Sequence, residues 1–220
     1  LRLVKALGTL HSRAVVMRTL GRQYPGEPEP RWSFGLYERR DGEPLWIGPP
    51  DPLLAPAPVD RARLTAFRDN LAHRLRALGW AAATVDAGRS LDLRIAVRLD
   101  GSPVPADPGP EPRLARESVH ANAIPCHGME DDLAAEGILL FAMGLVTEGP
   151  AYGCARIELP AFAGVEEFLT CLDAIGRSAA QAGLPALVIR GFPPPVDARI
   201  GWTTITPDPA VIEVNQAPYP

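Results

Sequence analysis

The chain has 220 residues, of which 46% are hydrophobic and 22% are charged, and these shares are ordinary for a globular protein. The formal net charge is −4, so the chain lacks the excess of positive charge that favours nucleic-acid backbones, and no nucleic-acid partner is expected. Lys5 is the single lysine, so a bound phosphate would be neutralised by arginine, by a metal or by backbone N–H groups.

Cysteine usage and hydropathy favour a cytoplasmic location. Cys126, Cys154 and Cys171 are odd in number and irregularly spaced, which indicates free thiols rather than a disulfide framework. No apolar run reaches the roughly 18 residues of a membrane span, and residues 1–20 do not resemble a signal peptide. We therefore expect a cytoplasmic protein with no membrane partner. The sequence stops at Pro220 within a motif, which indicates a section of a longer protein.

Residues 1–100 predict an N-terminal α/β section. Its first 23 residues favour a short helix or a partly disordered segment. Trp32–Tyr37 is typical of a strand, and the Asp41-Gly42 pair predicts a hairpin turn with Leu45–Ile47 as the return strand. The five prolines of residues 48–58 indicate a rigid connection.

One long helix follows, from Asp60 to Leu78. Its apolar residues recur at spacings of three and four, Asp60 is a good N-cap, and Gly79 follows the last apolar residue. Residues 91–99 then alternate apolar and polar side chains, which predicts a half-buried strand. Residues 101–136 begin rich in Pro and Gly and continue with weak patterning, and we interpret them as a connection.

Residues 137–220 predict a β-β-α-β-β-β section that is incomplete at its C-terminus. The helix runs over residues 162–182, and Gly183 and Pro185 end it. The whole chain is thus expected to be α+β, with a largely antiparallel sheet and helices packed on one face. The strands of this section are expected at residues 138–146, 155–159, 186–189, 202–206 and 211–214.

Four stretches of the sequence resemble the putative amidoligase family of bacteria. The first is Tyr24-Pro25-Gly26-Glu27 with the Trp- and Tyr-containing segments that follow it up to Trp46. The second is the helix around residues 67–79. The third runs from Gly183-Leu184-Pro185 to Gly191-Phe192-Pro193-Pro194-Pro195, and the fourth is residues 206–215, Thr-Pro-Asp-Pro-Ala-Val-Ile-Glu-Val-Asn.

The resemblance implies a glutamine-synthetase-like fold and a carboxylate–amine ligase that uses ATP and Mg²⁺ on peptide-like or small carboxylate and amine substrates. Members of the family are often fused to a transglutaminase-like domain. Three departures count against activity. Arg190 stands where the family usually has Glu, Gln216-Ala217-Pro218 lacks the family's His, and the middle section is short.

The resemblance suggests Glu213 as a metal ligand and Asn215 as its neighbour. Both offer hard oxygens suited to Mg²⁺, and because they are two apart on a predicted strand they share one face. A solvated strand face is the alternative interpretation. Arg31, Arg190 and Arg199 are candidate substrate or nucleotide contacts, and Arg190 is also a candidate partner of Glu213.

Two further motifs favour structural roles. Cys126-His127 has no second pair at metal-ligand spacing, and Asp208, between two prolines, is typical of a turn. Two functions remain open for the chain: a section of an ATP- and Mg²⁺-dependent amidoligase, or a non-catalytic relative that serves as a binding or scaffold domain. The retained Glu213 favours the first, and the three departures favour the second.

Overall fold

The computed structural model describes residues 2–20, 31–53, 56–85, 92–107, 109, 112–115, 133–207 and 211–218. Three α-helices lie within these residues, α1 (Arg2–Leu10), α2 (Arg61–Ala77) and α3 (Val165–Gln181), with a short 3₁₀ turn at Pro112–Ala115. The described strands are β1 (Val15–Leu20), β2 (Trp32–Arg39), β3 (Ala81–Val85), β4 (Leu93–Arg98), β5 (Leu139–Leu145), β6 (Ala155–Leu159), β7 (Leu187–Gly191), β8 (Ile200–Pro207) and β9 (Ile212–Gln216).

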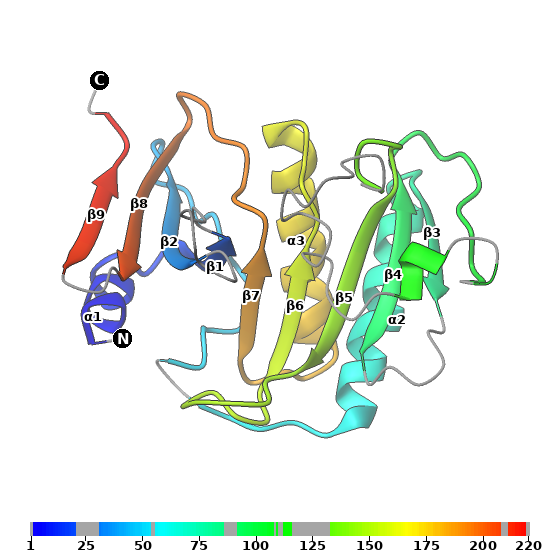
Figure 1. Ribbon diagram of the computed structural model, residues 1–220, viewed down its shortest axis with the longest axis horizontal. Coiled ribbons are helices and arrows are strands. Elements are labelled where there is room, and N and C mark those ends of the chain that lie inside the picture. Colours follow the sequence, from blue (N-terminus) through cyan, green and yellow to red (C-terminus); the bar gives the residue numbers. More distant parts are fainter. Residues whose placement is uncertain are drawn as a thin grey trace, which may run out of the picture.

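These nine strands form one sheet in the order β3-β4-β5-β6-β7-β1-β2-β8-β9 (Figure 1). The β6–β7 and β1–β7 pairs are parallel, and the other six described pairs are antiparallel. Helix α3 makes the crossover that the parallel β6–β7 pair requires. The predicted α+β class, the largely antiparallel sheet and the β-β-α-β-β-β order after residue 137 are confirmed.

The two ends of the chain interleave in this sheet. Strands β1 and β2, from the first hundred residues, lie between β7 and β8, which come from the last third. The predicted sections 1–100 and 137–220 therefore share one sheet, and the division of the chain into three sections stays a prediction.

Within the first fifty residues the predicted short helix is confirmed as α1, and two other expectations are wrong. Residues 15–20 form a strand, because β2 and β7 pair with β1 on either side and bury its Val15, Met17 and Thr19. The Asp41-Gly42 turn leads to no return strand, because β1 and β8 already occupy both edges of β2. Instead the backbone N–H of Leu45 donates to the carbonyl of Arg13.

Helix α2 begins and ends where the sequence predicts. Asp60 has an extended backbone, and its carboxylate accepts the N–H of Arg63 at 2.8 Å, as an N-cap does. Gly79 ends the helix with a φ of +86°, a conformation that glycine adopts without steric cost. No helix among the described residues is long and apolar enough to cross a membrane.

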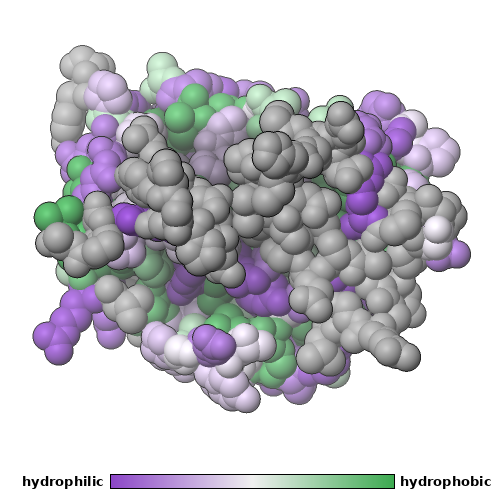
Figure 2. Space-filling model, in the orientation of Figure 1, coloured by the Kyte–Doolittle hydropathy of each residue, from purple (hydrophilic) through white to green (hydrophobic). Residues whose placement is uncertain are grey.

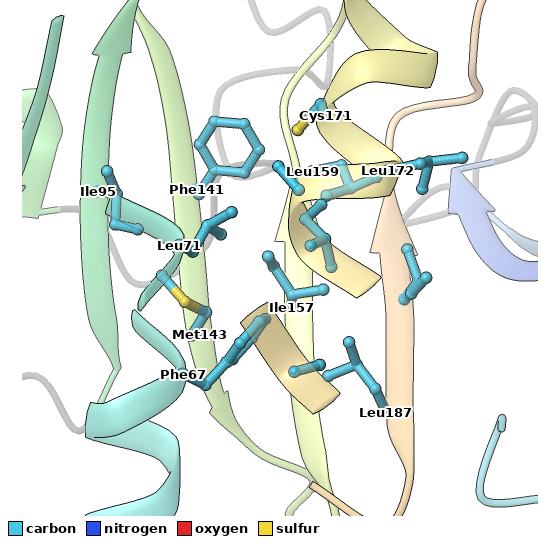
Figure 3. Close-up of a cluster of buried hydrophobic side chains, with 14 of the residues drawn as sticks. Phe67, Leu71, Ile95, Phe141, Met143, Ile157, Leu159, Cys171, Leu172 and Leu187 are labelled. Atoms are coloured by element: carbon cyan, nitrogen blue, oxygen red, sulfur yellow. The ribbon is translucent and has the colours of Figure 1, made fainter. Parts of the chain in front are cut away.

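The main core lies between helices α2 and α3 and one face of strands β4 to β7. Figure 3 shows Phe67 and Leu71 of α2 and Leu172 of α3 pointing toward Ile157 of β6. Cys171 also lies in this core, and burial raises the pKa of its thiol. Cys154 and Cys171 are free, buried thiols as predicted.

The opposite face of the sheet is also covered, so two further expectations fail. Helix α1 packs Val4 against Leu36 and Ile205 there, which places one described helix apart from α2 and α3. Residues 93–97 of β4 are all buried, so the strand is not half-buried. Its polar Arg94 is fully enclosed, although alternation alone placed it toward solvent.

We predict that Phe67→Ala destabilises the fold by about 3–5 kcal/mol, because Phe67 is fully buried and the substitution leaves a cavity beneath the sheet. Urea unfolding followed by circular dichroism measures this loss. Leu78→Ala, at an exposed position after α2, is the control and is expected to change stability by less than about 1 kcal/mol. Equal losses in the two variants would contradict the assigned core.

Candidate functional site

Glu213 and Asn215 lie on β9, an edge strand, and their side chains share one face of the sheet. The Asn215 amide Nδ2 donates to the Glu213 Oε1 at 2.9 Å, and both residues are exposed. Opposite them on β8 stand Thr206 and Thr204. The strand alternation therefore lines up a carboxylate, an amide and two hydroxyls, as the sequence predicts for the first two.

These side chains line a pocket of about 470 Å³, which we call the polar pocket. Ser33 of β2 stands opposite Thr206, and their hydroxyl oxygens are 2.6 Å apart, so one donates to the other. The segment after β7 contributes the apolar side of the pocket. The full lining is Ser33, Tyr37, Pro193, Pro194, Val196, Trp202, Thr204, Thr206, Glu213, Asn215 and Gln216.

Three of the four family-like stretches meet at the polar pocket. Tyr37 belongs to the first, Pro193 and Pro194 to the third, and Glu213 and Asn215 to the fourth. These stretches are up to about 180 residues apart in the chain, and only the pairing of β2, β8 and β9 brings them together. The second stretch, helix α2, contributes to the core instead.

The residues of the polar pocket suit Mg²⁺ only in part. Glu213 and Asn215 provide one carboxylate and one amide oxygen, and the described residues hold no group of three His, Cys, Asp or Glu that could bind a metal. Protein-bound Mg²⁺ commonly uses one or two carboxylates and completes its shell with water and substrate phosphates. Glu213 therefore fits a metal that arrives with a phosphate ligand, rather than a metal caged by protein.

Arg190 lies on the other face of the sheet from Glu213, so these two residues do not pair. Residues directly opposite on neighbouring strands share a face, whereas Glu213 and Asn215 flank Val214 and point the other way. The row that contains Arg190 runs through Arg18, Phe34 and Ile205 to Val214.

Arg190 instead joins a network of charges centred on a buried carboxylate. Its Nη2 donates to the fully buried Glu158, and the same carboxylate oxygen accepts Arg156 Nη1 at 2.8 Å. Arg156 Nη2 also contacts both carboxylate oxygens of Asp92, at 2.8 and 2.7 Å. Glu158 and Asp92 were not predicted, because acids separated by about 65 residues carry no motif until β4 to β6 pair.

A second pocket, of about 310 Å³, opens beside this network, and we call it the arginine pocket. It lies on the face that carries Glu158 and Arg190. Its lining residues are Arg18, Leu53, Val146, Thr147, Glu148, Pro150, Ala151, Arg156, Val188 and Arg190.

The other sequence candidates lie apart from both pockets. Arg199 is bound to Asp197 Oδ2 at 2.7 Å and to Glu166, and these contacts raise the pKa of its guanidinium. Arg31 precedes β2 and is partly buried. Cys126-His127 and Asp208 lie outside the described residues.

Tyr37 is expected to give the protein a pH dependence in the alkaline range. Burial raises the pKa of its phenol to about 12, and a hydrogen bond with Thr19 opposes this shift. Because the pKa of Tyr37 is higher in the folded than in the unfolded chain, its contribution to folding stability is fully present below about pH 10 and is lost as the pH rises through 12. The loss is about 2–3 kcal/mol.

Denaturant unfolding measured across this alkaline range tests the expectation. Tyr37→Phe is expected to lose this tyrosine's part of the pH dependence, and Tyr152→Phe, at an exposed position, is expected to keep it. The assignment would be contradicted if the free energy of unfolding of Tyr37→Phe fell with rising alkaline pH as steeply as that of the unmodified chain.

Comparison with models of protein families finds a match over most of the chain. The family model described as "Putative amidoligase enzyme (DUF2126)" matches residues 2–88 and 130–220. Comparisons with curated proteins and with solved structures give no significant match. The matched residues include β2, β8 and β9, which build the polar pocket, and Arg156 and Arg190 of the second pocket. Because this family model matches most of the chain's length, the chain belongs to the putative amidoligase family.

Proposed function

We propose that this chain is a section of a glutamine-synthetase-like carboxylate–amine ligase that uses ATP and Mg²⁺, with the polar pocket as its metal–nucleotide site. One observation carries the proposal: Glu213 and Asn215 share a pocket with the hydroxyls of Ser33 and Thr206, and three family-like stretches meet there. The family's description as an amidoligase supports the reaction type.

The chemistry requires an oxygen-rich site. When bound, ATP would supply the phosphoryl group that activates a substrate carboxylate as an acyl phosphate, with ADP leaving, and Mg²⁺ would neutralise the phosphate charge; an amine would then displace phosphate and form the amide. In this chain Glu213 would hold the metal through its carboxylate, and Asn215 would orient that carboxylate through the 2.9 Å hydrogen bond. The hydroxyls of Ser33 and Thr206 can donate to phosphate oxygens.

Substrates, partners and location follow from the same proposal. We propose peptide-like or small carboxylate and amine substrates, a transglutaminase-like domain fused or encoded nearby, and action in the cytoplasm. The substrates and the transglutaminase-like domain come from the family resemblance, and the location comes from the cysteine usage and the hydropathy of the sequence.

One observation favours a second candidate function, a non-catalytic binding or scaffold domain. Arg190, where the family usually has an acid, is engaged with Glu158 on the opposite face of the sheet. Glu213 is the single carboxylate among the described residues that line the polar pocket, so one charge would have to hold the metal.

Binding of ATP in the presence and absence of Mg²⁺, measured by isothermal titration calorimetry, tests the proposal. We expect Mg²⁺-dependent binding, and we expect Glu213→Gln to raise the Kd about tenfold or more, because a charge-assisted contact is lost. Glu43→Gln changes the same charge at an exposed position outside the pocket and is the matched control.

Two results would count against the proposal. Equal ATP affinities in Glu213→Gln and Glu43→Gln would remove Glu213 from the site. An unmodified chain that shows no Mg²⁺-dependent binding would favour the binding-domain function instead.

A further inference from the structure

The arginine pocket has a charged floor and a rim of different character. Arg18, Arg156 and Arg190 provide guanidinium groups, and the turn after β5 places Thr147 and Glu148 at the rim. Figure 2 views the molecule as Figure 1 does, and its described hydrophobic residues appear in several separate groups among hydrophilic ones. The lining of the arginine pocket itself holds three arginines and one glutamate, so a ligand for it is to be identified from its charges.

Two of the three arginines are already committed to protein acceptors. Arg156 donates from Nε to the carbonyl of Leu145 at 3.2 Å and from its two terminal nitrogens to Glu158 and Asp92. Arg18 forms an ion pair with the buried Asp51, with its Nη1 3.2 Å from the Asp51 Oδ2. These two arginines shape the floor of the pocket, and their main contacts are internal.

Arg190 has donors to spare. Its Nη2 is bonded to Glu158, and its Nε has no hydrogen-bond partner among the described residues but is buried, so a ligand would contact the terminal part of the guanidinium. Its guanidinium lies 5.7 Å from the centre of the Trp32 ring, which holds the planar group in place. The side chain remains 30% exposed, so a ligand in the pocket can reach it.

The electrostatics favour one negative charge on the ligand. Burial and then the positive charge of Arg156 lower the pKa of Arg190 to about 10, so an anion at this place would relieve both effects. The acids Asp51, Asp92 and Glu158 already balance the three arginines that line the pocket. A polyphosphate would add several charges next to these acids, whereas a carboxylate adds one.

The rim adds a site for a positive charge. Glu148 is exposed, lines the pocket, and forms no hydrogen bond or ion pair within the described part of the chain that competes for its carboxylate. A ligand with a carboxylate on Arg190 and an ammonium on Glu148 satisfies both groups at once. We propose that the arginine pocket binds a free α-amino acid, held through its carboxylate by Arg190 and through its ammonium by Glu148.

This site is independent of the polar pocket, because the two pockets lie on opposite faces of the sheet. Nuclear magnetic resonance of the arginine Nε–H groups tests it, with standard α-amino acids titrated one at a time. We expect the Arg190 signal to shift on addition of at least one of them. Arg190→Lys, which keeps the charge beside Glu158, is expected to weaken that amino acid's binding about tenfold or more.

Matched variants separate the two contacts. Glu148→Gln, at an exposed position, is expected to weaken binding of the same amino acid and to leave binding of its N-acetyl derivative unchanged. Arg177→Lys, on the exposed side of α3, is the control for Arg190→Lys. It is expected to change neither the binding of the amino acid nor that of its N-acetyl derivative.

Three outcomes would overturn the proposal. One is that no standard amino acid shifts the Arg190 signal. Another is equal affinity in the Arg190→Lys and Arg177→Lys variants. The third is inorganic phosphate that binds through Arg190 more tightly than every amino acid tested, which would make the pocket a site for anions in general.

Discussion

The parallel pairing of β1 with β7 is the constraint on which the rest of the molecule depends. Met17 stands opposite Ile189 in this pair, and both are buried in the main core. Because β1 also pairs with β2, this contact joins the β3–β7 half of the sheet to the β2–β8–β9 half. A parallel pair between strands about 170 residues apart closes a long loop, so the core around it must supply the compensating burial.

The same strands carry a charged layer on their opposite face. Glu158 stands between the apolar neighbours Ile157 and Leu159 and is fully enclosed, yet it receives both Arg156 and Arg190. Removing one partner of such a buried network leaves an uncompensated charge and costs several kcal/mol. The network therefore constrains how β6 and β7 can pair, and it holds Arg190 at the wall of the arginine pocket.

Each face of the sheet carries both a covered apolar region and a polar region. Helices α2 and α3 pack on the face that carries the polar pocket, which lies at the β2–β8–β9 end of the sheet. Helix α1 packs on the opposite face, which carries the charged network. Strand alternation produces this division, because neighbouring residues such as Glu213 and Val214 point to opposite faces. Two pockets of different chemistry can thus occupy one sheet without sharing a wall.

Local patterns in the sequence determined the elements whose stabilising contacts are short-range. The stripe and cap of α2, the apolar strands β5 and β6, and the shared face of Glu213 and Asn215 all follow from spacing along the chain. Only the tertiary structure decided the place of β1, the burial of Arg94, the missing return strand after Gly42 and the separation of Arg190 from Glu213. These features depend on which distant strands pair. The alternation of apolar and polar residues along a strand cannot say which of its faces a second layer will cover.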